Sequence, residues 1–517
     1  MIPRRLACLA AALAASAMIS HEAVAAKATA VIDARAAGMT IRPDIYGQFA
    51  EHLGTGIDGG IWVGPESSIP NIRGYRRDVV EALQRLKVPV VRWPGGCFAD
   101  IYRWRDGIGP RAQRPITLNK WWGNTEEKNQ FGTHEFFDFA ELIGARTYLN
   151  VNVGTATAGE AREWVEYVSS PTGSSLANMR RANGRDKPWK IDYIGIGNEM
   201  WGCGGNLTAQ EFSPMAKLFS TFLKEDKGPK LIAGGATGED YNWTETLVKS
   251  PRGQIDAISL HYYTLPTGDW AKHGPAIGFN EAEWAQTFVR TRKLEEMIRG
   301  HDSVMDKHDP EGKLGLMVAE WGTWYDVRPG TNSAFLQQEN TLRDALIAAT
   351  NFHIFHRHAD RVHMANIAQM VNVLQAMILT DGPRMALTPT YHAFMMYQPF
   401  QGATAVPVQI ASPGYRAGES SMPAIDVTAA RDAAGALHVG IVNVDPDEEG
   451  EVELDLRGFE GRAVEGLQLT AAKMDAQNTL SGRQEVVPTP FRSARWQGSK
   501  LHVRMPAKSV VRLTLKR

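Results

Sequence analysis

The chain has 517 residues, of which 43% are apolar and 22% are charged, and these proportions are typical of a globular protein. The length predicts two or more domains. The formal net charge of −1 excludes the strongly basic surface of most nucleic-acid-binding proteins, so we expect no nucleic-acid partner.

The first 25 residues have the pattern of a signal peptide. A short basic region, "MIPRR", precedes an apolar run at residues 6–19, and "AVA" at residues 23–25 fits a cleavage site of small residues. The apolar run is shorter than the ~20 residues that a membrane span needs. The sequence therefore predicts an exported protein, periplasmic or secreted, with no membrane partner.

Residues 44–388 alternate short apolar segments with segments of helical periodicity. Several apolar segments are continuous runs of Val, Ile and Leu, which is typical of parallel strands covered on both faces. The eight candidate strands are residues 44–53, 88–96, 145–154, 192–199, 230–235, 255–263, 314–321 and 361–369. This α/β pattern predicts a catalytic (β/α)8 TIM barrel. An open doubly wound sheet is the alternative, but no GxGxxG or P-loop motif follows the first strand.

The pattern changes in residues 389–517, where apolar and polar residues alternate between turn signals and helical periodicity disappears. This region predicts an all-β sandwich, jelly-roll-like in form. Residues 26–43 contain one more strand pattern, "ATAVIDARAAG", and we expect this N-terminal strand to join the sandwich.

The carboxyl ends of the predicted strands are rich in polar and aromatic residues. In a TIM barrel these ends meet at one mouth, where the active site lies. The residues there are Glu51, His52, Arg92, Asn152, Asn198, Glu199, His261, Tyr263, Glu320, Trp321, Asn366 and Gln369. So many functional side chains at one rim predict a site rather than a set of unrelated surface groups.

Two glutamates among them suggest glycoside hydrolysis. Glu199 and Glu320 end the fourth and seventh strands, which face each other across the mouth, and a retaining glycosidase needs two carboxyl groups ~5–5.5 Å apart. Their mutual repulsion is expected to raise the pKa of one of them. Asn198 is suited to bind a sugar hydroxyl. Candidate stacking faces for a sugar are Trp121, Trp122, Trp201, Trp321 and Trp324.

Two other hydrolytic chemistries have less support. A metal-dependent barrel hydrolase would need His-x-His on the first strand, where this chain has Glu51 and His52. The histidine-rich segment "FHIFHRHADRVH" at residues 352–363 falls mostly on a predicted helix, so we expect no metal site. A Ser/His/Asp hydrolase would need GxSxG after a strand, and the sequence contains none.

Seven motifs in chain order resemble glycoside hydrolase family 51, the α-L-arabinofuranosidases. They are "IYGQFAEHLG", "VVRWPGGCFADIYRWRDGIGP", "NQFGTHEF", "IGIGNEMWGCGG", "SLHYY", "VAEWGTWY" and "ANIAQMVNVLQA". The resemblance implies an enzyme that releases terminal α-L-arabinofuranosyl residues from arabinoxylan, arabinan or derived oligosaccharides by double displacement with retention. It also implies no metal or organic cofactor, and a homo-oligomer, commonly a hexamer.

The resemblance also implies roles for individual residues. Glu199, in "GNE", is expected to be the general acid/base, and Glu320, in "AEW", the nucleophile. Arg92 and Tyr263 are expected to orient the nucleophile. The other substrate-binding residues that it implies are Glu51, Asn198, His261, Trp324 and Gln369.

Cys97 departs from the family pattern. Many members read "PGGN" where this chain reads "PGGC", and a cysteine cannot replace the paired donor and acceptor of an amide. Whether Cys97 contacts the sugar is therefore open. Cys97 and Cys203 both follow strand ends around the same mouth, and we hypothesise that they form a disulfide after export.

Two alternative functions remain open at this point. One is a β-xylosidase or endo-β-1,4-glucanase on the same scaffold, because the shape of the pocket decides between these substrates and between exo and endo action. The other is a non-catalytic carbohydrate-binding protein, although the presence of both glutamates argues against it.

Overall fold

The computed structural model describes residues 26–36, 38–250, 254–461 and 463–516. Eight parallel strands close into a barrel whose ring follows the chain order β2-β5-β8-β9-β10-β11-β12-β13. Their bounds are β2 (Gly47–Phe49), β5 (Val90–Trp93), β8 (Arg146–Val151), β9 (Tyr193–Ile196), β10 (Lys230–Thr237), β11 (Ala257–Thr264), β12 (Gly315–Thr323) and β13 (Val362–Ile367). Each predicted strand overlaps one of these, so the TIM barrel is confirmed and the open sheet is excluded.

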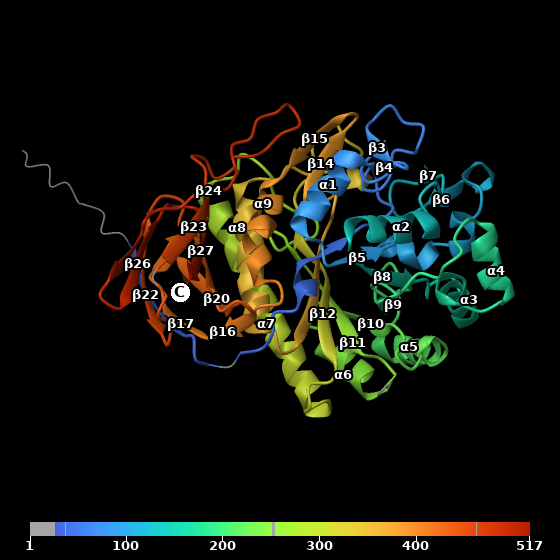
Figure 1. Ribbon diagram of the computed structural model, residues 1–517, viewed down its shortest axis with the longest axis horizontal. Coiled ribbons are helices and arrows are strands. Elements are labelled where there is room, and N and C mark those ends of the chain that lie inside the picture. The colour runs from blue at the N-terminus through green and yellow to red at the C-terminus, as the bar shows by residue number, and fades with distance from the viewer. Residues whose placement is uncertain (1–25, 37, 251–253, 462, 517) are drawn as a thin grey trace, which may run out of the picture.

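Helices connect the barrel strands and cover the outside of the barrel (Figure 1). They are α1 (Arg77–Leu86), α2 (Thr133–Ile143), α3 (Ala158–Ser169), α4 (Ser175–Ala182), α5 (Ala209–Leu223), α6 (Tyr241–Lys249), α7 (Glu281–His308) and α8 (Leu342–Arg357); α9 (Pro389–Tyr397) follows the barrel. Capping boxes define where several of them begin. At α5, for example, the Thr208 hydroxyl accepts the Glu211 N–H, and the Glu211 carboxylate accepts the Thr208 N–H.

The C-terminal region is a sandwich of two sheets, with strand orders β17-β1-β22-β26-β25 and β16-β20-β21-β27-β23-β24. Its strands are β1 (Ala26–Asp33), β16 (Thr404–Val406), β17 (Val408–Ala411), β20 (Ile425–Arg431), β21 (Leu437–Asn443), β22 (Gly450–Arg457), β23 (Ala463–Leu469), β24 (Thr489–Pro490), β25 (Ala494–Gln497), β26 (Lys500–Met505) and β27 (Ser509–Lys516). The N-terminal strand β1 pairs in parallel with β22, so both ends of the chain contribute to this sandwich.

Short two-stranded sheets occupy connections around these two units. They pair β3 (Asn71–Ile72) with β4 (Tyr75–Arg76), β6 (Thr117–Asn119) with β7 (Thr125–Glu127), β14 (Ile378–Asp381) with β15 (Arg384–Leu387), and β18 (Gly414–Ala417) with β19 (Ser420–Pro423).

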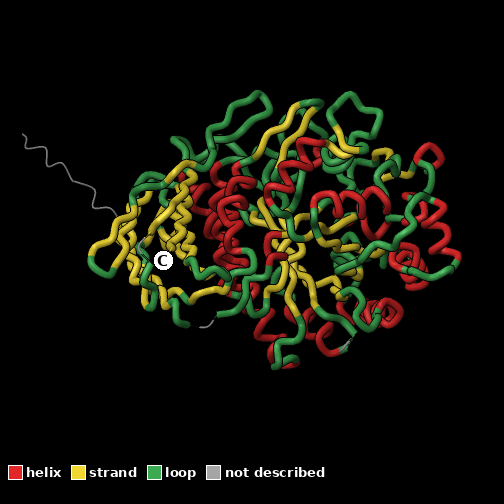
Figure 2. The backbone as a smooth tube through the Cα atoms, viewed as in Figure 1, coloured by secondary structure: helices red, strands yellow, loops and turns green. Residues whose placement is uncertain are grey.

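Helix α8 connects β12 to β13 and lies between the barrel and the sandwich in Figure 2. It packs against β20, β21 and β27, and its buried histidines serve this interface. His356 hydrogen-bonds Tyr46 and Thr428, and His353 hydrogen-bonds Tyr397. Through Thr428 on β20, His356 contributes to the packing of α8 against the sandwich.

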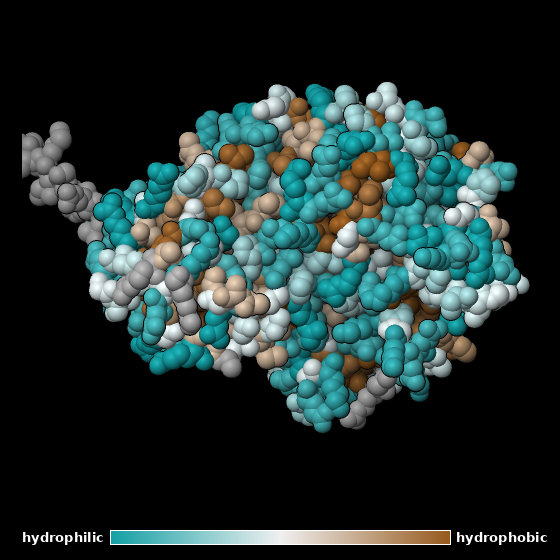
Figure 3. All heavy atoms as spheres, in the orientation of Figure 1, coloured by the Kyte–Doolittle hydropathy of each residue, from teal (hydrophilic) through white to brown (hydrophobic). Residues whose placement is uncertain are grey.

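Most large apolar side chains are packed inside the molecule. The face seen in Figure 3 is largely hydrophilic, with small hydrophobic areas between the charged groups. Exposed large apolar side chains in the described part of the chain include Trp270, which is 60% exposed. Its exposure matters for the site, because it stands beside the barrel mouth.

Candidate active site

Glu320 is a deeply buried carboxylate at the barrel mouth. It lies near the end of β12 and is 4% exposed. Arg92 on β5 donates from Nη1 to its Oε1 at 2.6 Å, and the Tyr263 hydroxyl donates to its Oε2 at 2.7 Å. Burial alone would raise the pKa of Glu320, but the charges and hydrogen bonds of His261, Arg92 and Tyr263 lower it below its ordinary value. Glu320 is therefore held as an oriented carboxylate.

Glu199 follows strand β9 and reaches toward the same point. Its side chain is 19% exposed, against 6% for Glu320, so it stands closer to the opening. His261 lies between the two: its Nδ1 is 3.0 Å from Glu199 Oε1 and 3.5 Å from Glu320 Oε2. One oxygen of each glutamate and a ring nitrogen of His261 lie within 4.8 Å of one another. The two predicted carboxylates thus face each other as a close pair.

Asn198 and Arg92 link these two groups. Arg92 donates from Nη2 to Asn198 Oδ1 at 2.6 Å while its other terminal nitrogen binds Glu320. Both side chains are almost fully buried. A single guanidinium therefore sets the position of Glu320 and of the amide that precedes Glu199.

Glu51 forms a second buried carboxylate beside this pair. Its Oε1 accepts the Phe98 N–H and the Trp122 Nε1–H, both at 3.0 Å, and its Oε2 accepts Gln369 Nε2 at 3.2 Å. Burial is the largest cause, and repulsion from the charge of Glu320 the second, of a rise in the pKa of Glu51 to about 7. Repulsion between Glu199 and Glu320 was expected to raise the pKa of one of these two glutamates, but the pKa of Glu320 is lowered, and a raised pKa occurs at Glu51 instead.

The buried charge of Glu51 should reduce stability at neutral pH. Its pKa is raised from an ordinary 4.5, which means that the folded protein holds the proton of Glu51 more tightly than the unfolded chain does. The free energy of unfolding that this proton contributes is fully present below pH 4.5 and is lost as the pH rises toward 7. Removing the charge by Glu51→Gln should therefore stabilise the fold by about 3 kcal/mol at pH 8 and by almost nothing at pH 4.5.

Thermal unfolding midpoints at the two pH values test this prediction. Glu66→Gln, at an exposed position, is the matched control and should change neither midpoint. A stabilisation by Glu51→Gln that is the same at both pH values would contradict the raised pKa.

An aromatic wall runs outward from the Glu320 side of the site. The ring of Tyr263 is 5.0 Å from that of Trp324, which is 5.3 Å from the exposed ring of Trp270. These rings line a cleft of about 630 Å³ together with Glu199, Trp201 and His261. The cleft reaches Glu199, the more exposed of the two glutamates, and is large enough for a sugar ring.

The structure brings most of the predicted residues together and separates a few. Eight side chains form one connected site: Glu51, Arg92, Asn198, Glu199, His261, Tyr263, Glu320 and Gln369. Trp324 lines its cleft. His52 instead pairs with Glu127, and Asn152 bonds Thr155 and the Tyr102 carbonyl oxygen. These two residues hold loops rather than facing the cleft.

The proposed stacking role of Trp321 is wrong. Trp321 is completely buried, with its ring against Phe352, Phe355 and Phe394. Trp122 has a different relation to the site, because its indole N–H is bonded to Glu51. Neither Trp270 nor the buried Asp100, whose carboxylate accepts the Asn198 N–H, was predicted from the sequence.

Cys97 and Cys203 are joined by a disulfide, as hypothesised from their places beside the mouth. The bridge links the segment after β5 to the segment after β9. Cys203 Sγ lies 3.7 Å from Glu199 Oε2, so the bridge borders the more exposed glutamate. Its sulfur atoms carry no thiol hydrogen, which leaves Cys97 without a donor for a sugar hydroxyl.

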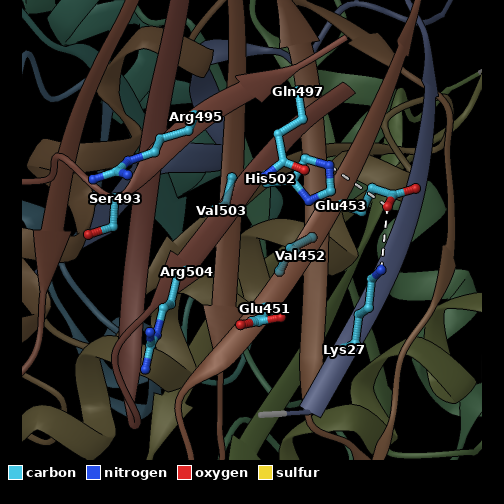
Figure 4. A pocket seen from close by; sticks show the side chains of 10 residues that line it. All are labelled: Lys27, Glu451, Val452, Glu453, Ser493, Arg495, Gln497, His502, Val503 and Arg504. Carbon is cyan, nitrogen blue, oxygen red and sulfur yellow. Dashed lines mark ion pairs between the residues drawn. The ribbon is translucent and has the colours of Figure 1, made fainter. Parts of the chain in front are cut away.

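A second polar hollow, of about 430 Å³, lies on the sandwich (Figure 4). Three of its side chains form ion pairs: Glu453 is 3.5 Å from Lys27 Nζ and 3.9 Å from His502 Nε2. None of the predicted site residues lines it. The barrel mouth is therefore the candidate active site.

Comparison with known proteins identifies the family. The α-L-arabinofuranosidase 1 domain matches residues 82–274, and the α-L-arabinofuranosidase C-terminal domain matches residues 319–509. An intracellular exo-α-L-arabinofuranosidase of Bacteroides ovatus is 44% identical over 97% of this chain and 98% of its own. The crystal structure of the GH51 arabinofuranosidase from Xanthomonas axonopodis pv. citri is 50% identical, covers 95% of this chain and 100% of its own, and superposes with a TM-score of 0.93.

These relatives contradict the predicted export. The Bacteroides ovatus protein is named intracellular, as is an exo-α-(1→5)-L-arabinofuranosidase of Halalkalibacterium halodurans that is 31% identical over 89% of this chain and 93% of its own. The prediction of a periplasmic or secreted protein is therefore wrong. It depended on residues 1–25 alone, which lie outside the described residues, and a short basic and apolar stretch is a weak constraint. No helix in the described part of the chain is long and apolar enough to cross a membrane.

The conclusion on family does not depend on residues 1–25. Both domain matches, the full-length relatives and the shared fold agree with the seven motifs, and they favour neither the β-xylosidase or glucanase alternative nor a non-catalytic protein. The chain therefore belongs to glycoside hydrolase family 51 and is an α-L-arabinofuranosidase.

Proposed function

We propose that the enzyme releases terminal α-L-arabinofuranosyl residues from arabinoxylan, arabinan or their oligosaccharides by double displacement, with Glu320 as nucleophile and Glu199 as acid/base. The observation that carries this proposal is the close approach of the two carboxylates, whose oxygens lie within 4.8 Å. Retaining glycosidases have carboxyl groups ~5–5.5 Å apart, whereas inverting enzymes need ~6.5–9.5 Å to admit a water molecule.

In the first step, a Glu320 oxygen attacks the anomeric carbon, and the bond from that carbon to the leaving oxygen breaks. The lowered pKa of Glu320 keeps it ionised for this attack. Glu199 gives its proton to the leaving oxygen, which suits its more exposed position on the side of the cleft. The products are an arabinosyl ester of Glu320 and a free alcohol.

In the second step, Glu199 acts as a base. It takes a proton from water while the water oxygen attacks the anomeric carbon, and the ester bond to Glu320 breaks. The His261 ring, within 3.5 Å of both carboxylates, is suited to keep them aligned through both steps. Two inversions at one carbon restore the original configuration.

Sugar hydroxyls are proposed to bind Glu51, Asn198 and Gln369, and Trp324 to pack against the ring. Glu51 and Gln369 are already bonded to each other, and Asn198 is fixed by Arg92, so the three polar groups are preorganised. A homo-oligomer remains a prediction.

Proton NMR of the first-formed sugar tests the stereochemistry. We expect the α-anomer of arabinose to appear first, followed by mutarotation. Initial release of the β-anomer would contradict the double displacement. A panel of chromogenic glycosides tests the substrate, because preference for a xyloside or glucan over the α-L-arabinofuranoside would contradict the proposed sugar.

A further inference from the structure

The short 3-10 helix η2 (Cys97–Ile101) follows one strand end at the barrel mouth and connects it to three others. It directly follows the Pro-Gly-Gly turn after β5. The Phe98 N–H is donated to Glu51, which follows β2, and Cys97 is bonded to Cys203 in the segment after β9. The Asp100 carbonyl oxygen accepts the Thr155 hydroxyl, in the segment after β8, at 2.9 Å. Five residues therefore tie the neighbouring rim segments to one another.

The side chain of Asp100 makes the central contacts of this segment. Its Oδ1 accepts the N–H groups of Val153 at 2.8 Å and Gly154 at 2.9 Å, both just after β8. Its Oδ2 accepts the Asn198 N–H, just after β9, at 2.8 Å. The carboxylate thus bridges two adjacent strand ends through three backbone donors.

Burying the carboxyl group of Asp100 in this way costs free energy. Asp100 is 1% exposed, and no ion pair to it is present in the described part of the chain. Burial raises its pKa to about 7, against the opposing effect of the three N–H groups. An ionisable group kept at such a cost beside a catalytic glutamate points to a role in the site.

The backbone around Glu199 needs this support. Gly197 has a φ of 74° and Glu199 a φ of 42°, so a glutamate adopts a left-handed conformation that side chains other than glycine rarely take. The turn is also tightly packed, because a Cβ at Gly204 would lie 2.1 Å from the Asn198 carbonyl oxygen. Such a conformation persists only where the surrounding contacts impose it.

We propose that Asp100 is a positioning residue for the acid/base: by accepting the Asn198 N–H together with those of Val153 and Gly154, it holds the Asn198–Glu199 turn in the conformation that aims the Glu199 carboxyl at the leaving oxygen. The inference rests on the proposed role of Glu199. The Cys97–Cys203 bridge is a second tie on the same turn.

Asp100→Asn tests the inference with almost no change of shape. An asparagine has one acceptor oxygen and one NH2 group. Its NH2 group must therefore face a backbone N–H that the second carboxylate oxygen of Asp100 accepts in the wild-type protein. Either the Asn198 N–H or the Val153 and Gly154 N–H groups lose their partner. A shift of the acid by even ~1 Å is expected to cost about 10²-fold in the step that needs its proton.

The expected signature depends on the leaving group. For Asp100→Asn, kcat/KM on an arabino-oligosaccharide should fall at least about tenfold more than kcat/KM on 4-nitrophenyl α-L-arabinofuranoside, whose leaving group needs little protonation. A merely structural role would lower both by the same factor. Asp100→Ser, which also loses an acceptor oxygen, should likewise lose more activity on the oligosaccharide than on the aryl substrate. The second variant keeps the test possible if the first fails to fold.

Asp44→Asn is the matched control. Asp44 is also a buried aspartate that connects β8 and β9, but at their other ends, where it accepts the Tyr193 hydroxyl and pairs with Arg146. Its loss should lower the thermal unfolding midpoint without changing the ratio between the two substrates. Equal losses on both substrates in the folded Asp100 variants would overturn the inference.

The result also separates the two proposals. If Glu199→Ala discriminates between the substrates and the Asp100 variants do not, only the positioning role fails. If Glu199→Ala itself shows no discrimination, the proposed acid/base role fails first.

Discussion

Replacing Glu320 with alanine is expected to abolish turnover of every arabinofuranoside, with kcat falling roughly 10⁴- to 10⁶-fold, the scale seen when a catalytic nucleophile is removed. The loss should be the same for aryl and oligosaccharide substrates, because neither can form the covalent intermediate. Steady-state kinetics on both substrate types, with folding checked by circular dichroism, measures it.

Glu320→Gln is the control for structure. It keeps the side-chain shape and an acceptor oxygen for Arg92, and its NH2 group can donate to the Tyr263 hydroxyl oxygen, so a folded but equally inactive protein would assign the loss to nucleophilicity rather than to packing. Substantial activity of either variant on aryl substrates would contradict the role of Glu320.

Replacing Glu199 with alanine should divide substrates by their leaving groups. Oligosaccharides, whose leaving oxygen needs a proton, are expected to lose about 10²- to 10⁴-fold in kcat/KM, whereas activated aryl arabinofuranosides should lose little. Their kcat should still fall, because the variant also lacks the base for the second step. A pre-steady-state burst of aryl alcohol is therefore expected.

Added azide provides the control for this variant. It needs no base, and the space left by the Glu199 side chain opens to the cleft, so azide should restore kcat on aryl substrates and yield the arabinosyl azide. Equal losses on aryl and oligosaccharide substrates, without rescue, would contradict the acid/base role.

The order of elements and both glutamates could be predicted because parallel strands leave clear signals. Buried apolar runs mark the strands, and the polar residues that end them must meet at one mouth. Glu199 and Glu320 were found in this way, as were Arg92 on β5 and His261 and Tyr263 on β11. The first strand was the least regular: only Gly47–Phe49 are in the sheet, and residues 43–46 form a 3-10 helix beginning at a proline.

Side-chain direction explains the errors at the rim. Neighbouring residues on a strand point to opposite faces, so Glu320 and Trp321 cannot both face the mouth. Glu320 points inward beside His261, while Trp321 points outward into the helix layer. The same holds after β2, where Glu51 enters the site and His52 turns to Glu127.

Asp100 could not be predicted, because its function depends on contacts between segments far apart in the chain. It lies on a 3-10 helix rather than at a strand end, and its partners are backbone N–H groups, which have no sequence signature. Trp270 is similar, since it lies in the connection after β11 and lines the cleft beside Trp324, which is far from it in the chain.

Mass spectrometry of the trapped intermediate tests the two-glutamate mechanism most directly. Glu199→Ala enzyme mixed with an activated aryl α-L-arabinofuranoside and quenched in acid should gain the mass of one arabinosyl group, carried by the peptide that contains Glu320. An arabinosyl group on any other residue, or no adduct during a measured burst, would contradict it.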